Sequence, residues 1–482
     1  MDIVTFKDAS PVLPPRWGRK RLAELIEARE SVNPAKMNSD EFFYVDIEAL
    51  DNAAQRITAP KRLKTNAAPS RARVAIRKGD VIFSLVRPYL KNIAVVPGHL
   101  DEQVASTAFC QLRPKADVDS RFIFFQLIQD SFISSIPTYG NSPPAARDDE
   151  FLDISVVFAP PEAQQAVVGK IEELFSDLDA GVAALKRAQT NLKRYRAALL
   201  KAAVEGRLTG QWRAERKAKG IATEPAAQLL ARILLERRKK WEAAQQKKFA
   251  DAGKAPSTGW QKNYPDPAAP DASHLRALPE GWCWVSVDTA GNVLLGRQRA
   301  PQYVTGRFPH RYLRVANIKD DRIDYSDLEE MDFDETHFAK YRLEIDDILV
   351  SEGQSPELVG QSAIYRGEID NLCFQKTLHR FRAIQGQVLT EFAQTVFRAH
   401  VRSGLFKKIA SITTNIAHLT LEKFCASPFP LAPLSEQTEI VAQVEAKLSN
   451  IAQAETEIKR SLERAARLRQ AILKRAFEGR LV

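Results

Sequence analysis

The sequence predicts an α+β protein with two copies of one unit, each a globular α/β part followed by a long helix. Two observations lead to this fold class: an internal repeat with a shift of about 270 residues, and a seven-residue apolar repeat that ends each copy. The length of 482 residues suffices for about three domains, each able to bury its own core.

Four stretches carry the repeat. They are 13–17 with 278–282, 76–84 with 343–351, 159–164 with 432–437, and 200–208 with 473–481. The last two pairs share a shift of 273 residues, whereas the globular parts match at 265 to 269. The domain boundaries that follow are 1–160 and 275–433 for the globular parts, 161–210 and 434–482 for the helices, and 211–274 for an insertion.

The globular parts mix strand and helix signals. Residues 74–84 and 343–351 alternate apolar and polar side chains around a Lys-Gly-Asp or an Ile-Asp-Asp turn, which predicts a pair of strands in each part. We expect further strands at 44–47 and 312–315, and helices at 120–133 and 389–401.

Each helical part carries an apolar stripe with a seven-residue period, which is typical of a coiled coil. We expect the two helices to pair antiparallel, as a pseudo-twofold repeat. Pro161 suits a first helical turn, Ser435 suits an N-cap, and Gly206 and Gly479 suit C-terminal caps. The helix-pairing residues are Ile171, Leu178, Leu185, Leu192, Leu199, Val444, Ile451, Ile458, Ala465 and Ile472.

The insertion at 211–274 has no counterpart in the other copy. Residues 226–248 predict a basic amphipathic helix, and residues 251–274, rich in Pro, Ala and Asp, predict a linker. The chain has a formal net charge of +10. Residues 211–250 hold eleven basic and four acidic residues, whereas the globular parts are nearly neutral, so most of the excess lies in the insertion.

Composition excludes several classes of protein. No apolar run approaches the length of a membrane span, and the N-terminus lacks a basic region followed by an apolar stretch, so we expect a cytoplasmic protein without a secretory signal. The four cysteines form no Cys-x-x-Cys pair, which argues against a zinc ribbon or a disulfide framework.

Signatures of catalysis are missing as well. The sequence has no P-loop, no G-x-G-x-x-G after a strand and no nucleophile elbow, and the Asn-Ser-Pro-Pro stretch at 141–144 departs from the Asn-Pro-Pro-Tyr loop of methyltransferases. The acidic clusters at 148–150 and 332–335 are typical of solvated turns. We therefore expect no catalytic residue and no metal site, and a binding or scaffold protein in place of an enzyme.

At this point the motifs resemble those of a known family. The second helix opens with Pro433-Leu434-Ser435-Glu436-Gln437 and closes with Leu-Arg-Gln-Ala-Ile-Leu-Lys-Arg-Ala-Phe-Glu-Gly-Arg-Leu-Val at 468–482. Together with the stretches at 312–318 and 346–351, these motifs resemble the specificity (S) subunits of type I restriction-modification systems. The resemblance covers nearly the whole chain, with the insertion as a departure from the shortest members.

The resemblance implies a non-catalytic, two-headed reader of double-stranded DNA. Each globular part would be a target recognition domain that reads one half of a split site, and the paired helices would set the spacing. Two methyltransferase (M) subunits and two restriction/motor (R) subunits would be the partners, with no membrane involved. S-adenosylmethionine, ATP and Mg would be bound by those partners, and this chain would hold no cofactor itself. The apolar stripe from Ile171 to Leu199 is about 42 Å long, which compares with about 34 Å for one DNA turn.

Side chains that read bases are expected on two loops of each recognition domain, after the predicted strand pair and near 138–142 or 412–415. Arg suits guanine and Gln suits adenine. Arg297 and Arg299 are candidates for phosphate contacts. The full set of candidates is Ser84, Arg87, Tyr89, Lys91, Asn92, Tyr139, Asn141, Arg297, Arg299, Arg314, Gln354, Ser355, Thr414 and Asn415.

Two further hypotheses compete with this function. One is a helical scaffold that binds only proteins, and the other is an autonomous nuclease or methyltransferase, which would need catalytic motifs. Three interpretations of the basic helix at 226–248 also stay open: contact with DNA phosphates, docking of an M subunit, and a solvated extension of the coiled coil.

Overall fold

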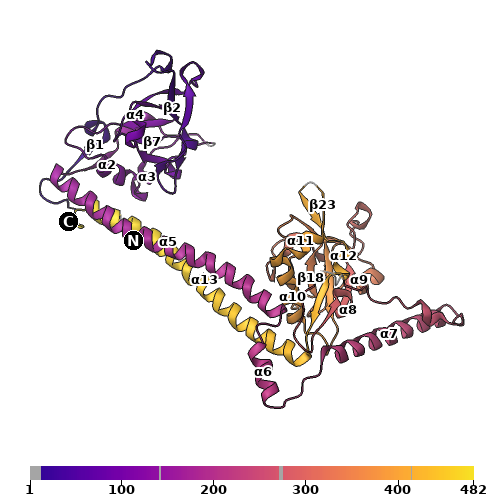
Figure 1. The fold of residues 1–482 in the computed structure, drawn as a ribbon. Coiled ribbons are helices and arrows are strands. Elements are labelled where there is room, and N and C mark those ends of the chain that lie inside the picture. Colours follow the sequence, from indigo (N-terminus) through magenta and orange to yellow (C-terminus); the bar gives the residue numbers. More distant parts are fainter. Residues whose placement is uncertain (1–11, 141–142, 271–274, 414) are drawn as a thin grey trace, which may run out of the picture. The chain divides into compact units, whose positions relative to one another are not determined.

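The computed structural model describes residues 12–140, 143–270, 275–413 and 415–482, and it forms two compact units (Figure 1). Unit 1 contains residues 1–188 and 457–482, and unit 2 contains residues 189–456. Each unit thus holds one globular domain and a part of both long helices, α5 (Pro161–Val204) and α13 (Leu434–Phe477). The predicted fold class, α+β with two α/β domains and two long helices, is confirmed.

The globular domain of unit 1, domain 1, is closed by its first and last strands, β1 (Gly18–Arg21) and β11 (Ser155–Phe158), which pair antiparallel. Its two main sheets have the strand orders β5-β2-β9-β6 and β10-β7-β8. The other strands are β2 (Glu41–Val45), β3 (Leu50–Asp51), β4 (Arg56–Ile57), β5 (Lys61–Lys64), β6 (Ala72–Ile76), β7 (Val81–Ser84), β8 (Ile93–Val95), β9 (Gln103–Ser106) and β10 (Phe109–Leu112). Its helices are α1 (Leu22–Leu25), α2 (Ser120–Leu127), α3 (Asp130–Ser135) and α4 (Asp148–Leu152).

The globular domain of unit 2, domain 2, is closed in the same way by β12 (Cys283–Ser286) and β25 (Pro428–Leu431). Its larger sheets have the orders β13-β22-β18-β20, β17-β14-β21 and β19-β24-β23. The other strands are β13 (Gly291–Leu295), β14 (Pro309–Leu313), β15 (Ile318–Lys319), β16 (Arg322–Ile323), β17 (Glu329–Asp332), β18 (Ile348–Ser351), β19 (Gly353–Gln354), β20 (Ser362–Ile364), β21 (Cys373–Phe374), β22 (Leu378–Ala383), β23 (Ser411–Thr413) and β24 (Ile416–His418). Its helices are α8 (Val287–Ala290), α9 (Glu335–Tyr341), α10 (Thr390–Ser403), α11 (Leu405–Ile409) and α12 (Leu421–Cys425).

The predicted strand pairs at 74–84 and 343–351 are wrong. In domain 1 the two strands exist as β6 and β7, but β6 pairs with β9 whereas β7 pairs with β8 and β10, in a different sheet. In domain 2 only β18 is a strand, and it pairs with β20 and β22. Alternating apolar and polar side chains indicate a half-buried strand, but they do not indicate which strand pairs with it.

The turn before β7 and β18 holds a buried carboxylate, which explains why this motif recurs. Asp80 accepts the Arg77 N–H at 2.9 Å and two bonds from the Arg113 guanidinium at 3.1 Å each. Asp347 likewise accepts two bonds from Arg382, at 2.7 and 2.8 Å. A buried charge is tolerated only when it is paired and hydrogen-bonded. The motif therefore has a structural role inside each domain.

Both long helices begin at the same local structure. The carbonyl oxygens of Pro160 and Pro433 accept the first helical N–H groups, so Ser435, predicted as an N-cap, lies inside the first turn and that prediction is wrong. Four residues after these prolines, Gln164 and Gln437 are fully buried. Each amide accepts one N–H from the start of a domain helix and donates to two carbonyls: Asp119 N–H, Asp117 O and Ala159 O for the first, and Leu389 N–H, Gln387 O and Ala432 O for the second. The start of each long helix is thereby fixed to the domain that precedes it.

The helix ends are equivalent too, and the predicted glycine caps are confirmed. Gly206 and Gly479 adopt φ values of +66° and +70°, and each donates its N–H to the carbonyl three residues earlier at 3.1 Å. A Cβ on Gly206 would lie 2.5 Å from Pro279 Cγ, and a Cβ on Gly479 would lie 2.1 Å from Pro14 Cγ. Each helix therefore ends against the first residues of a domain from the other copy of the repeat.

Within each unit the two long helices run antiparallel. In unit 1, Asp179 of α5 pairs with Arg469 of α13 at 2.6 Å. In unit 2, Arg196 of α5 pairs with Glu455 of α13 at 2.9 Å. All ten predicted helix-pairing residues are buried or half buried, as expected for a packed stripe. The stripe continues into the cores, because Ile171 and Ile472 share the core of unit 1 with Phe122 of α2.

The insertion forms two helices, α6 (Gly210–Ala218) and α7 (Ala226–Asp251), both in unit 2. The first turns of α7 are buried in the core of unit 2 through Ala226, Leu229 and Ile233, so α7 is a separate element packed on domain 2 and the coiled-coil extension is wrong. The linker prediction is also wrong in part, because Trp260 is buried and stacks on Trp241 at 5.6 Å between ring centroids.

The glycine caps generate a stability prediction. Replacing Gly479 by Ala would place a side chain at positive φ and against Pro14, so we expect a loss of about 1–3 kcal/mol in the free energy of unfolding, measured by urea denaturation. The matched control is Gly181→Ala in the middle of α5, where nothing lies within 4 Å and helix propensity favours Ala by about 1 kcal/mol. Equal effects of the two substitutions would contradict a specific role for the helix end.

Candidate nucleic-acid interface

In domain 1 the two loops predicted to read DNA lie side by side. The loop after β7 and the stretch up to Ala145 are joined by a bridge between Val86 and Ala145, and by a 2.9 Å bond from the Arg87 N–H to the Pro144 carbonyl. A second bridge joins Tyr139 to Ala145. The predicted positions 84–92 and 138–140 therefore form one surface.

The candidate residues on the first loop divide into two groups. Ser84 and Asn92 are buried, and Lys91 donates to the Ile128 carbonyl and the Asp130 carboxylate, so these three support the loop. Arg87 and Tyr89 are exposed, and the Arg87 guanidinium has no partner among the residues that the structure describes. Both stay predictions as DNA contacts, and their exposed side chains are accessible to a ligand.

The second loop of domain 1 presents a tyrosine. Tyr139 donates its hydroxyl to Glu150 at 2.9 Å, and this bond raises the pKa of the phenol. The Arg147 guanidinium lies 4.4 Å from the Tyr139 ring centroid. The candidate Asn141 lies outside the described residues.

In domain 2 the equivalent loops are joined by strand pairing. β19, directly after β18, pairs with β24, so that Gly353 lies opposite His418 and Gln354 lies opposite Ala417. β24 in turn pairs with β23 to form a hairpin that projects from domain 2 (Figure 1). The sequence match between the two domains thus locates the same pair of loops in each.

The candidate residues on these loops are half exposed or exposed. Gln354 accepts the Ser355 N–H at 3.0 Å through its side-chain oxygen, which leaves its amide N–H groups for a ligand. Asn415 is exposed at the hairpin turn, and Thr414 lies outside the described residues. Gln354, Ser355 and Asn415 stay predictions.

Two of the three remaining candidate arginines are engaged inside domain 2. Arg297 is buried, donates to the Asp332 carbonyl and stacks on the Tyr303 ring at 4.3 Å. Arg314 pairs with Asp327 at 2.5 Å and with Glu329 at 3.0 Å. Arg299 is exposed and lies 3.6 Å from Glu329. A DNA contact by Arg297 or Arg314 would require breaking these bonds, so both have a structural role here and, of the three arginines, only Arg299 is accessible.

The acidic cluster at 332–335 accepts hydrogen bonds that stabilise the local backbone. Backbone and hydroxyl donors of Thr305 and Phe308 bind the Asp332 carboxylate, and these bonds lower its pKa to about 2. Asp334 caps α9 by accepting the His337 N–H. In the part of the chain that the structure describes, no group of three or more His, Cys, Asp or Glu side chains has the arrangement of a metal site.

Two buried histidines bind backbone carbonyls of the segment that follows the β23–β24 hairpin. His379 binds the Leu419 carbonyl at 2.7 Å and His400 binds the Pro428 carbonyl at 2.8 Å. Burial lowers the pKa of each imidazole to about 4, so both are neutral near pH 7. These neutral rings fix the chain just after the hairpin and just before α13.

Sequence reasoning included Tyr89 and Tyr139 but missed the aliphatic side chains of this surface, those of Leu90, Ile412 and Ile416. In domain 1 the large apolar side chains that are exposed, among the described residues, are those of Val12, ahead of β1, and of Tyr89, Leu90 and Tyr139 on the two paired loops. In domain 2, Ile412 and Ile416 are exposed on the hairpin. The available signal was the Ile-Thr-Thr-Asn-Ile stretch at 412–416, where isoleucines flank a polar turn.

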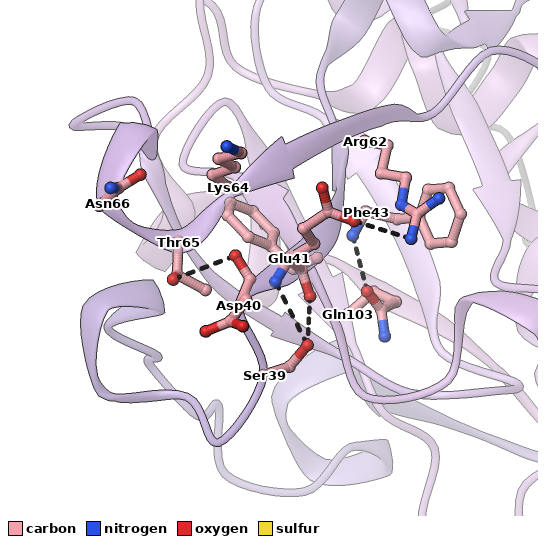
Figure 2. A pocket seen from close by; sticks show the side chains of 10 residues that line it. Ser39, Asp40, Glu41, Phe43, Arg62, Lys64, Thr65, Asn66 and Gln103 are labelled. Atoms are coloured by element: carbon pink, nitrogen blue, oxygen red, sulfur yellow. Dashed lines mark hydrogen bonds and ion pairs between the residues drawn. The ribbon is translucent and has the colours of Figure 1, made fainter.

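A cavity of about 1100 Å³ lies elsewhere in domain 1, along β2 and β5. Figure 2 shows that its polar side chains bind one another: Arg62 pairs with Glu41 at 2.7 Å, and Gln103 accepts the Phe43 N–H at 2.7 Å. None of the candidate DNA-reading residues lines it.

Comparison with known proteins finds similarity to one family. Residues 317–464 match the sequence model of the type I restriction modification DNA specificity domain. The chain is 25% identical over 387 residues to the StySPI type I restriction enzyme specificity subunit of Salmonella potsdam, covering 78% of this chain and 68% of that protein. The chain is thus similar to type I restriction enzyme specificity subunits.

Two solved structures have the same fold as this chain. The S subunit (HsdS) from Thermoanaerobacter tengcongensis superposes with a TM-score of 0.54 at 24% identity, over 97% of this chain and 98% of that one. A chain from a study of assembly and conformational transition in the type I restriction-modification system gives a TM-score of 0.69 at 24% identity, over 97% and 99%. The match to the family model spans most of domain 2 and more than half of α13. Among the described residues, no helix is long and apolar enough to cross a membrane.

Proposed function

We propose that this chain is the DNA-reading subunit of a type I restriction-modification complex, in which domain 1 and domain 2 each read one half of a split site. The observation that carries the proposal is a contrast between the domains. Both domains have paired first and last strands, a buried Asp–Arg pair and a buried glutamine that fixes the following long helix. They differ in the side chains that are exposed on their equivalent paired loops. Two DNA-binding domains with the same architecture but different loops suit a target with two different halves.

The long helices are suited to setting the distance between the halves. α5 and α13 each contain 44 residues without a break, and an unbroken helix has a length fixed at about 1.5 Å per residue. Their ends are fixed to the domains by the buried amides of Gln164 and Gln437 and by the glycine caps. The spacing of the two readers would therefore follow from helix length.

In this proposal the chemistry belongs to partner subunits. Two M subunits would bind S-adenosylmethionine and methylate adenine, and two R subunits would use ATP and Mg for translocation and cleavage. The chain itself would bind duplex DNA and these subunits in the cytoplasm, without a cofactor and without catalysing a step. The distribution of charge supports this division, because nearly neutral readers rely on partners that close around the duplex to gain affinity.

Sequencing of adenine methylation tests the proposal. Cells that express this chain with its M subunits should methylate a two-part motif, and deletion of the gene for this chain should abolish methylation at that motif while the M subunits remain. Methylation that persists unchanged without this chain would favour a scaffold protein over a DNA reader.

The exposed arginine of domain 1 gives a second test. Arg87→Ala should relax the methylated motif at one position of one half, with a loss of about tenfold in base preference, because an Arg pair to guanine contributes on that order. Arg56→Ala, also exposed and in domain 1, is the matched control and should leave the motif unchanged. An equal loss of methylation at all sequences would identify Arg87 as a phosphate contact.

Helix length gives a third test. Repeating one heptad in both α5 and α13 preserves the apolar stripe and adds about 10 Å to each helix, so the spacer of the methylated motif should lengthen by about three base pairs. Adding two residues to each helix rotates the stripe by about 200° and should prevent assembly. A longer helix pair with an unchanged spacer would refute the role in spacing.

A further inference from the structure

The β23–β24 hairpin of domain 2 is apolar on both of its faces. Ile412 lies opposite Ala417, and Ile416 lies opposite Thr413. Residues directly opposite each other in an antiparallel pair point to the same face, and successive residues point to opposite faces. Ile412 and Ile416 therefore project from opposite faces, and they are 52% and 51% exposed.

Both ends of this hairpin are fixed to the body of domain 2. Lys423 of α12 donates to the Ser411 hydroxyl at 2.9 Å, and His379 of β22 binds the Leu419 carbonyl at 2.7 Å. Gly353 of β19 packs against the His418 ring, where a Cβ would lie 3.2 Å from Nδ1. The two isoleucines are thus presented by a preorganised ribbon.

The surroundings of the hairpin are basic and polar. Lys407 and Lys408 precede it in α11, and Lys423 follows it in α12. Lys376 is exposed on the segment whose Thr377 carbonyl accepts the Glu352 N–H, next to β19. Lys376 and Lys408 have no ion-pair partner in the described part of the chain, so positive charge is available around an apolar projection.

We propose that this hairpin enters the major groove of the half-site read by domain 2, and that Ile412 and Ile416 contact the C5-methyl groups of thymines there. A flat protein surface would cover only one face of the ribbon, whereas a groove encloses both. The major groove is about 12 Å wide, admits a two-stranded β-ribbon, and displays the thymine methyl as its apolar group. Flanking lysines would face the phosphates on either side. The inference rests on the proposed function and names the chemical group that one reader recognises.

The test uses the full chain assembled with its M subunits. The double variant Ile412→Ala/Ile416→Ala should accept any base at one or more A·T positions of one half of the methylated motif. The other half, identified by its response to Arg87→Ala, should keep its preference. Ile345→Ala is the matched control, since Ile345 is an isoleucine of the same domain, 67% exposed and outside the hairpin; it should leave both halves unchanged.

A binding measurement isolates the methyl groups. Replacing thymine by uracil at the affected positions of a duplex probe should weaken binding of the unchanged complex by about fourfold for each methyl group lost. The double variant should bind the thymine and uracil probes equally. Thermal unfolding of the double variant, with a midpoint equal to that of the Ile345→Ala control, separates this effect from misfolding.

Each other outcome overturns the inference in a distinguishable way. A split motif that the double variant reads unchanged would refute the hairpin contact and leave the proposed function standing. Loss of M-subunit binding by the folded double variant would make the hairpin a protein docking site. Equal loss of methylation at all sequences would indicate a general DNA contact without base reading. Absence of any split motif with the unchanged chain would overturn both the proposed function and this inference.

Discussion

The contact on which the rest of the structure depends is the one between the end of each long helix and the beginning of a domain. Gly479 ends α13 against Pro14, and Gly206 ends α5 against Pro279, so each domain receives the helix end of the other copy. The buried amides of Gln164 and Gln437 fix the opposite helix ends to their own domains. A domain held at a helix start and at a helix end requires antiparallel helices beside it, which is the arrangement that Asp179–Arg469 and Arg196–Glu455 show in the two units.

Features that depend on local sequence were predictable. The long helices, their glycine caps and the apolar stripe follow from periodicity and from the φ that only glycine adopts easily. The basic helix of the insertion was also predicted and is α7. The recurrence of Asp80 and Asp347 was visible in the sequence, but its reason was not, because the arginine that pairs with each aspartate is more than thirty residues away.

Features that depend on distant partners were not predictable. Arg297 and Arg314 looked like DNA contacts by residue type, yet carbonyl and carboxylate groups of domain 2 bind their guanidinium groups. The strand pairs failed because β6 and β7 lie in different sheets. The isoleucines of the hairpin were overlooked because an apolar residue in a sequence predicts burial, and only the structure places Ile412 and Ile416 on a projecting ribbon.

The residues that hold each domain to the long helices differ from the residues that we propose to read DNA, so the two sets can change separately. Asp80, Gln164, Gly479 and their counterparts in unit 2 are buried or conformationally restricted, so substitution there costs stability. Arg87 and Tyr89 in domain 1 and Ile412 in domain 2 are exposed and bury little surface, so substitution there leaves the free energy of unfolding nearly unchanged. Because the anchors of the hairpin, His379 and Lys423, lie outside its tip, the side chains at the tip can change without loosening the ribbon. If each domain reads one half of the target, as we propose, a new specificity can arise in one domain while the other domain and the long helices stay as they are.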